Sequence, residues 1–229
     1  MVNVVTIAVI DDGIADHFFQ EQCVLRMKVD ALGRITRDQT EAAVPTHGTL
    51  CAGIIRRYMP DCRLISIRIL SEKTRKGTLQ QLLAALDWCT RKKIRLCNLS
   101  LGTSYWKDYF PLKRAVYKMV RQGQILVAAM GNDGQMLMPA DLHGVIRVKE
   151  DLHMQGYSLR CCTGRFRQPD FYASSSHFLE LDDAKGYTLV NGNSYATAVV
   201  TAAIAQMMKE MPGAGRNQIM NQMRKRYGR

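Results

Sequence analysis

The sequence lacks the features that would assign it at once to several common classes of protein. It has no CxxC pair with the spacing of a zinc site and no zinc-finger or RNA-recognition motif. Its start, "MVNVVTIAVIDDG", lacks the basic flank, apolar core and small-residue cleavage site of a signal peptide. The uncharged run between Lys185 and Lys209 is too rich in Asn, Ser, Thr and Gln to cross a membrane. We therefore expect a cytoplasmic protein without a membrane-spanning helix.

Cysteine usage and charge point to a reducing compartment and an acidic partner. The chain has 7 cysteines, an odd number, which favours free thiols over a framework of disulfides. Lys and Arg outnumber Asp and Glu by 32 to 20, which gives a formal net charge of +12. A charge of this sign suits nucleic acid, an anionic surface or an acidic peptide. The basic residues are scattered except in "RKRYGR" at 224–229, which we interpret as a solvated helix end rather than a nucleic-acid-binding motif.

Short apolar segments alternate along the chain with longer segments of helical periodicity. The apolar segments are rich in branched residues and predict strands at 4–10, 63–70, 94–100 and 124–130. The periodic segments predict helices at 47–57, 77–92 and 108–122. Strands separated by helices of this length form parallel sheets through right-handed crossovers. We therefore expect one α/β domain over residues 1–229, with a mostly parallel central sheet and helices on both faces.

Chemically useful side chains follow the predicted strands and begin two of the helices. Asp11 follows the first strand, Asn132 follows the fourth, His47 begins a helix, and Ser194 begins the last helix. Each has a structural interpretation as well, because Asp and Asn occur in turns, His at the surface, and Ser as a helix cap. Ligands of parallel sheets bind beyond the carboxyl ends of the strands, where these groups would meet. Together they supply the nucleophile, base, orienting carboxylate and oxyanion donor that acyl transfer needs.

Five motifs resemble those of the subtilisin-like serine proteases, or subtilases, and occur in the order of that family. They are "VIDDGI" at 9–14, "HGTLCAGII" at 47–55, "NLSLG" at 98–102, "AAMGNDG" at 128–134 and "GNSYATA" at 192–198. The resemblance implies the subtilisin-like three-layer fold. It also implies that Ser194 is the nucleophile and His47 the general base and then acid. In the same way, Asp11 would orient His47, and Asn132 would join the Ser194 amide as an oxyanion donor.

The resemblance also predicts where a substrate binds. The family implies that Ser100, Leu101 and Gly102 pair in β fashion with an extended peptide. Further substrate-binding residues that it implies are Ala129, Gly131 and Asp133. A carboxylate at Asp133 would favour Lys or Arg before the scissile bond, and a solvated turn residue is an equal alternative.

Several residues depart from the subtilase pattern. The usual Gly-Thr-Ser is "GNS" at 192–194, and the proline common shortly after the serine is Ala198. Only ten residues precede Asp11, so we expect no folding pro-segment in this chain. The segment 56–64 is too short for the loop that holds structural calcium in secreted members. The departures predict a small intracellular-type subtilase with no metal and no cofactor.

These observations predict a serine endopeptidase that processes a peptide or protein precursor, for example by removing an acidic leader. Two other hypotheses stay open. The chain can be a catalytically weak subtilase fold that binds peptides, since fold and motif do not guarantee turnover. It can also be a basic α/β protein that binds nucleic acid, which only the net charge favours. Labelling by a fluorophosphonate separates the first two hypotheses, and a salt-dependent shift with DNA or RNA tests the third.

Overall fold

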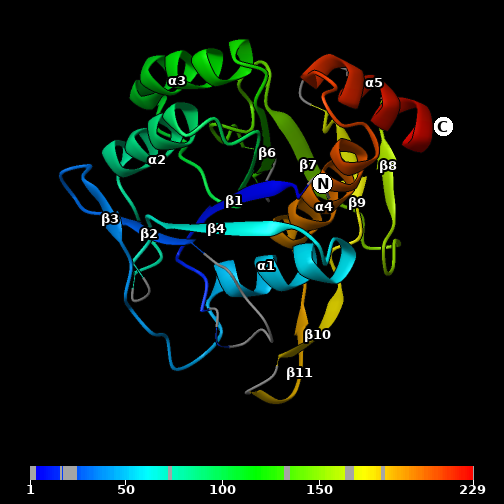
Figure 1. The fold of residues 1–229 in the computed structure, drawn as a ribbon, viewed down its shortest axis with the longest axis horizontal. Helices are drawn as coiled ribbons and strands as arrows, with labels where there is room; N and C mark the ends of the chain where they lie inside the picture. Colours follow the sequence, from blue (N-terminus) through cyan, green and yellow to red (C-terminus); the bar gives the residue numbers. More distant parts are fainter. Residues whose placement is uncertain are drawn as a thin grey trace.

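The computed structural model of the protein describes residues 4–15, 17, 25–71, 74–131, 135–162, 168–181 and 184–228. A nine-stranded sheet runs through it in the order β3-β2-β4-β1-β5-β6-β7-β9-β8 (Figure 1). Its strands are β1 (Thr6–Asp11), β2 (Leu25–Val29), β3 (Ile35–Arg37), β4 (Arg63–Arg68), β5 (Leu96–Leu99), β6 (Ile125–Ala129), β7 (Ile146–Glu150), β8 (Leu159–Cys161) and β9 (Phe171–Ala173). Neighbouring strands are parallel except for the outermost pair at each edge. The prediction of an α/β fold with a mostly parallel sheet is therefore confirmed.

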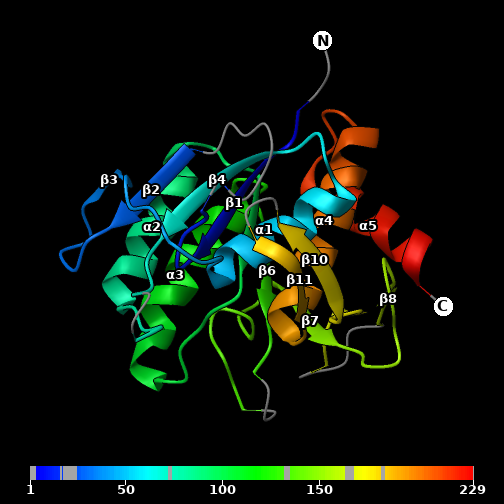
Figure 2. The same ribbon diagram turned by 90° about the horizontal axis from the view of Figure 1, so that it is seen from below.

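Helices cover both faces of this sheet (Figure 2). One face carries α2 (Leu79–Arg91) and α3 (Tyr109–Arg121), and the other carries α1 (His47–Tyr58), α4 (Asn193–Glu210) and α5 (Arg216–Tyr227). Side chains of β1 alternate between two cores: Ile7 and Val9 pack with α1 and α4, whereas Ala8 and Ile10 pack with α2 and α3. Because alternate side chains of a strand point to opposite faces, a strand buried on both faces is apolar throughout. The three-layer arrangement follows from this pattern.

The predicted strands and helices are present with small shifts at their ends, but several elements were missed. These are β2, β3, β7, β8 and β9, the separate hairpin of β10 (His177–Leu181) and β11 (Ala184–Val190), and all of α5 except its end. Strands such as β3 and β8 have only 3 residues, too few for a periodic pattern. Residues 224–227 of the basic tail are the end of α5, a helix that buries Ile219, Met220 and Met223. Within the described ranges, no helix is long and apolar enough to cross a membrane.

The carboxyl ends of the central strands bring distant segments to one edge of the sheet. β1 ends at Asp11, β5 is followed by Ser100, and β6 is followed by Met130. β1 pairs with β5 and β5 pairs with β6, so these strand ends are neighbours. The starts of α1 and α4 are tied to the same edge, by hydrogen bonds to Asp12 and to Met130.

Candidate active site

Asp11, the last residue of β1, faces His47, the first residue of α1. His47 Nδ1 lies 2.9 Å from Oδ1 and 3.0 Å from Oδ2 of Asp11. The Asp11 side chain is only 1% exposed, and that of His47 is 11% exposed. α1 begins here because Thr46 is its N-cap, with Thr46 Oγ1 accepting a hydrogen bond from Thr49 N. With Nδ1 bonded to the carboxylate, Nε2 is the imidazole atom that can exchange a proton.

A glycine after His47 allows this close approach of helix and strand. A Cβ at Gly48 would lie 2.4 Å from Gly13 O and 3.1 Å from the Asp11 Cβ. Because the first of these contacts is with backbone, a larger residue would push the start of α1 away from the end of β1. Thr46 Oγ1 also donates a hydrogen bond to Gly13 O at 2.7 Å, which fixes the same approach.

Asp12 is a second buried carboxylate at this place, and no motif assigned a role to it. Its Oδ1 accepts a hydrogen bond from Gly48 N at 2.8 Å, and its Oδ2 accepts one from His47 N at 3.2 Å. Asp12 thus satisfies amide donors at the start of α1, where a negative charge is favourable. Burial and the charge of Asp11 raise the pKa of Asp12, against the opposing effects of the Gly48 amide, His47 and Arg75. In the sequence, the only indication that Asp12 has a role at this site was its position directly after Asp11.

Two effects on His47 oppose each other. Burial disfavours the charged imidazole, whereas the hydrogen bond and charge of Asp11 favour it. The Asp11 effects prevail, so the pKa of His47 lies above its ordinary value of 6.5. The pair therefore forms a base that accepts a proton more readily than an isolated imidazole.

Ser194 lies in the first turn of α4 but does not cap it. The helix begins at Asn193, its N-cap is Gly192, and no side chain makes a capping hydrogen bond. The prediction that Ser194 begins and caps the last helix is therefore wrong. Gly192 has a φ of 127°, a conformation that glycine adopts at little cost, and it turns the chain into the helix without a capping side chain. The hydroxyl of Ser194 is left available for chemistry.

Asn193 fastens the start of α4 to two strand ends. Its Oδ1 accepts a hydrogen bond from Glu150 N at 2.8 Å, and its Nδ2 donates one to Met130 O at 3.0 Å. The side chain is buried, so both hydrogen bonds lie away from water. Sequence reasoning treated Asn193 only as a departure from the family pattern, whereas the structure gives it a positioning role beside Ser194.

Cys51 and Tyr195 connect the Ser194 segment to His47. Cys51 lies one turn after His47, and its Sγ is 3.9 Å from Ser194 O and 3.7 Å from Ser100 Oγ. The Tyr195 ring centroid is 5.4 Å from that of His47. Within the described ranges, no hydrogen bond joins the Ser194 hydroxyl to His47; in proteins without substrate such bonds are often long. Burial raises the pKa of Cys51 well above its usual value, so this group is a neutral thiol.

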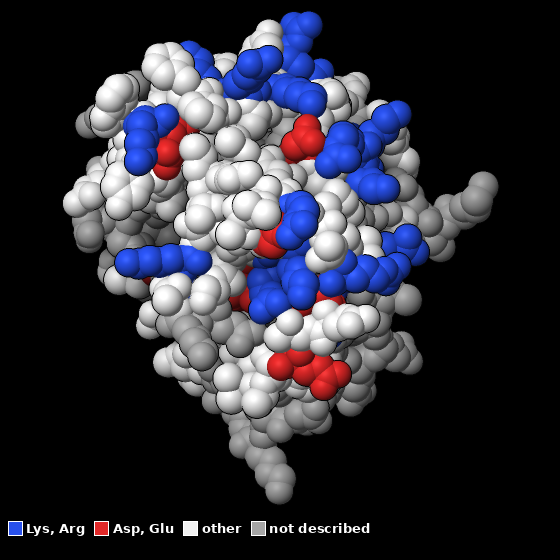
Figure 3. Space-filling model, turned by 90° about the vertical axis from the view of Figure 1, so that its left-hand side faces the viewer, with Lys and Arg blue, Asp and Glu red and all other residues white. Residues whose placement is uncertain are grey.

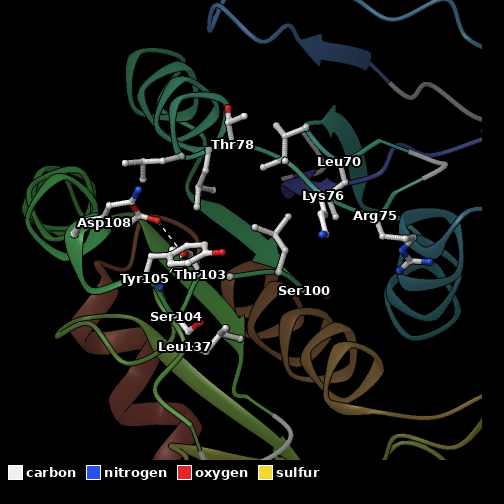
Figure 4. A pocket seen from close by; sticks show the side chains of 17 residues that line it. Leu70, Arg75, Lys76, Thr78, Ser100, Thr103, Ser104, Tyr105, Asp108 and Leu137 are labelled. Atoms are coloured by element: carbon white, nitrogen blue, oxygen red, sulfur yellow. Dashed lines mark hydrogen bonds between the residues drawn. The ribbon is translucent and has the colours of Figure 1, made fainter.

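Two cavities lie along the segment that follows β5, and they share Ser100, Ser104 and Leu137 in their walls. The smaller has a volume of about 300 Å³ and includes Ser194, Asn193, Ala129 and Gly131 in its lining. The larger has a volume of about 720 Å³ and includes Leu101 and Gly102 (Figure 4). The expected substrate-binding residues that the structure describes all line one of these cavities.

Asn132 and Asp133 lie outside the described residues, so their predicted roles stay predictions. The flanking Gly131 approaches Gln135 closely, since a Cβ at Gly131 would lie 2.8 Å from Gln135 O. None of the described residues that line the smaller cavity is charged. The expected preference for Lys or Arg before the scissile bond therefore rests on Asp133 alone.

A metal ion has few candidate ligands here. Among the residues that the structure describes, one group could supply three ligands, namely Asp11, His47 and Cys51, whose ligand atoms lie within 4.8 Å of one another. Asp11 and His47 already bond to each other, and the Cys51 thiol is neutral, so this group is better suited to proton transfer than to holding a cation.

Comparison with known proteins places these features in a family. The profile described as "Subtilase family" matches residues 3–226. The chain is similar to the minor extracellular protease Epr of Bacillus subtilis (strain 168), with 28% identity over 233 residues that cover 96% of this chain and 34% of that protein. It is also similar to the major intracellular serine protease of the same organism, with 25% identity over 69% of this chain and 54% of that protein. The chain thus spans between a third and just over half of these relatives.

A solved structure shares the fold over nearly the full length. The crystal structure of a lanthipeptide protease matches with a TM-score of 0.75 and 17% identity, covering 96% of this chain and 79% of that chain. At this level of identity the likeness shows a common fold.

Proposed function

The chain belongs to the subtilase family, and we propose that it is a serine endopeptidase that works through Asp11, His47 and Ser194. The observation that carries the proposal is the 2.9 Å hydrogen bond between His47 and Asp11, next to the start of the helix that bears Ser194. Contacts of Cys51 with Ser194 and Ser100 hold the two helix starts together.

In the proposed reaction, Ser194 Oγ attacks the carbonyl carbon of the scissile peptide bond while His47 Nε2 takes the hydroxyl proton. Asp11 accepts a hydrogen bond from Nδ1–H and stabilises the imidazolium that forms. Asn132 and the Ser194 amide would donate hydrogen bonds to the oxyanion. His47 then passes the proton to the leaving amine, and water releases the acyl group by the same steps in reverse.

A fluorophosphonate probe tests this function. The wild-type protein should react covalently at one serine, and Ser194→Ala should remove both the labelling and the cleavage of a peptide library followed by mass spectrometry. A folded wild-type protein that neither reacts nor cleaves any peptide would refute the proposal and favour a peptide-binding subtilase fold instead.

The substrate that we propose is a peptide or protein precursor with an acidic segment. Two observations support it, namely the shared fold with a lanthipeptide protease and the net charge of +12. Asp133 would add a preference for Lys or Arg before the scissile bond. Product analysis of the same library measures both preferences, and Asp133→Asn should weaken only the second.

The cellular setting is also a proposal. Cys51, Cys62, Cys89, Cys97, Cys161 and Cys162 are free, which supports a reducing compartment such as the cytoplasm. The similarity to a major intracellular serine protease supports the same setting. Both cores pack against the same nine-stranded sheet, which supports a single peptidase domain over residues 1–229.

A further inference from the structure

The cavity of about 720 Å³ has a basic rim, and we propose that Arg75, Lys76 and Lys107 make it select acidic residues of the substrate. The inference rests on the proposed endopeptidase function and names the side chains that would set its preference for charge. The cavity shares Ser100, Ser104 and Leu137 with the smaller cavity beside Ser194, so one extended peptide can reach both.

Among the residues that the structure describes, three cationic side chains line the larger cavity: Arg75, Lys76 and Lys107. Figure 4 shows Arg75 and Lys76 on one side of it, opposite Tyr105 and Asp108. Arg75 Nη1 lies 3.9 Å from Asp12, at the margin of an ion pair, and its side chain is 54% exposed. Within the described part of the chain, neither Lys76 nor Lys107 forms an ion pair. Two of the three cations therefore keep their charge available for a ligand.

Two backbone hydrogen bonds connect Arg75 and Lys76 to Ser71. Arg75 N donates a hydrogen bond to Ser71 O at 2.8 Å, and Ser71 N donates one to Lys76 O at 3.1 Å. Arg75 has a φ of 52°, a conformation uncommon for a residue with a side chain. Such backbone conformations often occur at ligand-binding segments. These hydrogen bonds tie the backbone of Arg75 and Lys76 to Ser71.

Among the described residues that line the cavity, Asp108 is the one acidic residue, and it is already engaged. It is 6% exposed, and its Oδ2 accepts a hydrogen bond from Thr103 Oγ1 at 2.8 Å. In the described part of the lining, the charged residues are therefore three cations and one carboxylate that is hydrogen-bonded within the protein. The net positive charge favours a ligand that carries carboxylates.

The rest of the lining is apolar and hydroxylic, which suits a peptide better than a small anion. The apolar residues are Ile69, Leu70, Leu79, Leu82, Leu101 and Leu137. A volume of about 720 Å³ is that of a site for a ligand of several residues rather than for one side chain. Acidic residues alternating with aliphatic ones would match the basic rim and the apolar wall together.

An exposed aromatic face continues from the cavity. Tyr105, which lines the cavity, is followed by Trp106 in the 3₁₀ helix η2 (Trp106–Asp108), which runs directly into α3. Trp106 is 75% exposed, and Phe110, in the first turn of α3, is 68% exposed. Exposed aromatic side chains grouped in this way mark an interaction surface.

The same face is basic, which decides the kind of partner. Exposed on α3 are Lys113, Arg114, Lys118 and Arg121. Figure 3, which views this side of the molecule, shows more Lys and Arg than Asp and Glu. Like charges disfavour a second copy of this chain, whereas an acidic peptide with apolar residues complements both the charge and the aromatic rings. The site therefore extends from the cavity onto the start of α3.

A matched pair of substrates tests the proposal. The peptide that is cleaved best in the library is extended on its amino-terminal side with Glu-Leu-Glu-Leu or with Gln-Leu-Gln-Leu. For the wild-type protein, KM for the acidic version should be lower by about fivefold at low salt, the size expected for two partly exposed ion pairs, with kcat nearly equal. Lys76→Glu and Lys107→Glu should each remove part of this difference, and the double variant should reverse it. Trp106→Ser should raise KM for both versions.

Lys225→Glu on α5 is the control, because it makes the same charge change on the opposite face of the sheet (Figure 1). It should keep the full preference for the acidic peptide. Equal KM values for the two peptides in a wild-type protein that cleaves both would overturn the acidic subsite and leave the peptidase function standing. Failure of labelling and cleavage together would instead count against the peptidase function.

Direct binding measurements test two other classes of partner, an anionic membrane surface and RNA. Vesicles of phosphatidylcholine with phosphatidylglycerol, and a single-stranded RNA, are tested for binding to the wild type and to Lys107→Glu. If the wild type binds vesicles or RNA, Lys107→Glu binds them more weakly, and KM is equal for the two peptides, the proposal is overturned. The basic face would then be assigned to that partner. No binding to either, combined with the fivefold preference, would support the acidic peptide.

Discussion

His47 Nδ1 lies 2.9 Å from Asp11 Oδ1, and this contact links the protonation of the imidazole to the carboxylate at the end of β1. Burial alone would lower the pKa of His47, but Asp11 raises it above 6.5. Only the neutral imidazole can take the Ser194 proton, so kcat/KM should fall on acidification with a midpoint above pH 6.5.

Asp11→Asn tests whether Asp11 is what raises the pKa of His47. Without the carboxylate, burial prevails and the pKa of His47 falls, so the imidazole becomes neutral over a wider range of pH. The titration should move to lower pH even though catalysis drops by orders of magnitude, because the imidazole loses its orienting partner. NMR titration of the imidazole in both proteins measures the shift, and an unchanged midpoint would contradict the role given to Asp11.

Ser194→Ala should abolish activity without loss of stability. Because the side chain makes no capping hydrogen bond, the free energy of unfolding should change by less than about 0.5 kcal/mol. Urea unfolding and fluorophosphonate labelling measure the two effects. Ser176→Ala, at an exposed position, is the control and should keep both activity and labelling.

Asn193→Ala should lower both stability and kcat. The substitution leaves Glu150 N–H and Met130 C=O without their partner, at a cost of about 1–3 kcal/mol in unfolding free energy. Because Met130 lies two residues before Asn132, kcat should fall more than KM changes. Asn193→Asp keeps the acceptor for Glu150 N but sets a buried carboxylate oxygen against Met130 O, so it should also lower stability. Equal stability of wild type and Asn193→Ala would refute the positioning role.

Chelators should neither inactivate nor unfold the protein. Asp61 is the only carboxylate in the segment 56–64 and pairs with Lys209, whereas calcium binds through about six to eight oxygen ligands. Melting temperature and peptidase activity with EDTA, with and without added calcium, check this. A large drop with EDTA that calcium reverses would point to a calcium site.

A mercurial should stop catalysis through Cys51. Its thiol lies between the helix starts that carry His47 and Ser194, 3.9 Å from Ser194 O, so a heavy atom bound there would displace them. Cys51→Ala should resist the inhibitor, whereas Cys162→Ser, at a more accessible position, should remain sensitive. Iodoacetamide should act slowly on Cys51, because burial raises its pKa and leaves little thiolate. Equal inhibition of wild type and Cys51→Ala would assign the effect to another cysteine.

The sequence by itself determined the layers of the fold and the residues of the proposed site. Segments such as 4–10 and 124–130 are apolar at every position because the strands there are buried on both faces, a pattern that needs no tertiary knowledge. The order of the motifs around Asp11, His47 and Ser194 was likewise enough to indicate the subtilase family. Edge strands of 3 residues were missed because so short a segment has no period.

Only the tertiary structure decided how these residues are held and what surrounds them. Asp12 accepts hydrogen bonds from residues 35 and 36 positions away, and Asn193 bonds to strands 43 and 63 positions away. No local pattern encodes such contacts, because they exist only once the strands are in register. Ser194 was assigned to the cap because its residue type favours that position, but the backbone conformation of Gly192 replaced a capping side chain. The basic rim joins Arg75 and Lys76 to Lys107, from two segments that the sheet brings to the same cavity.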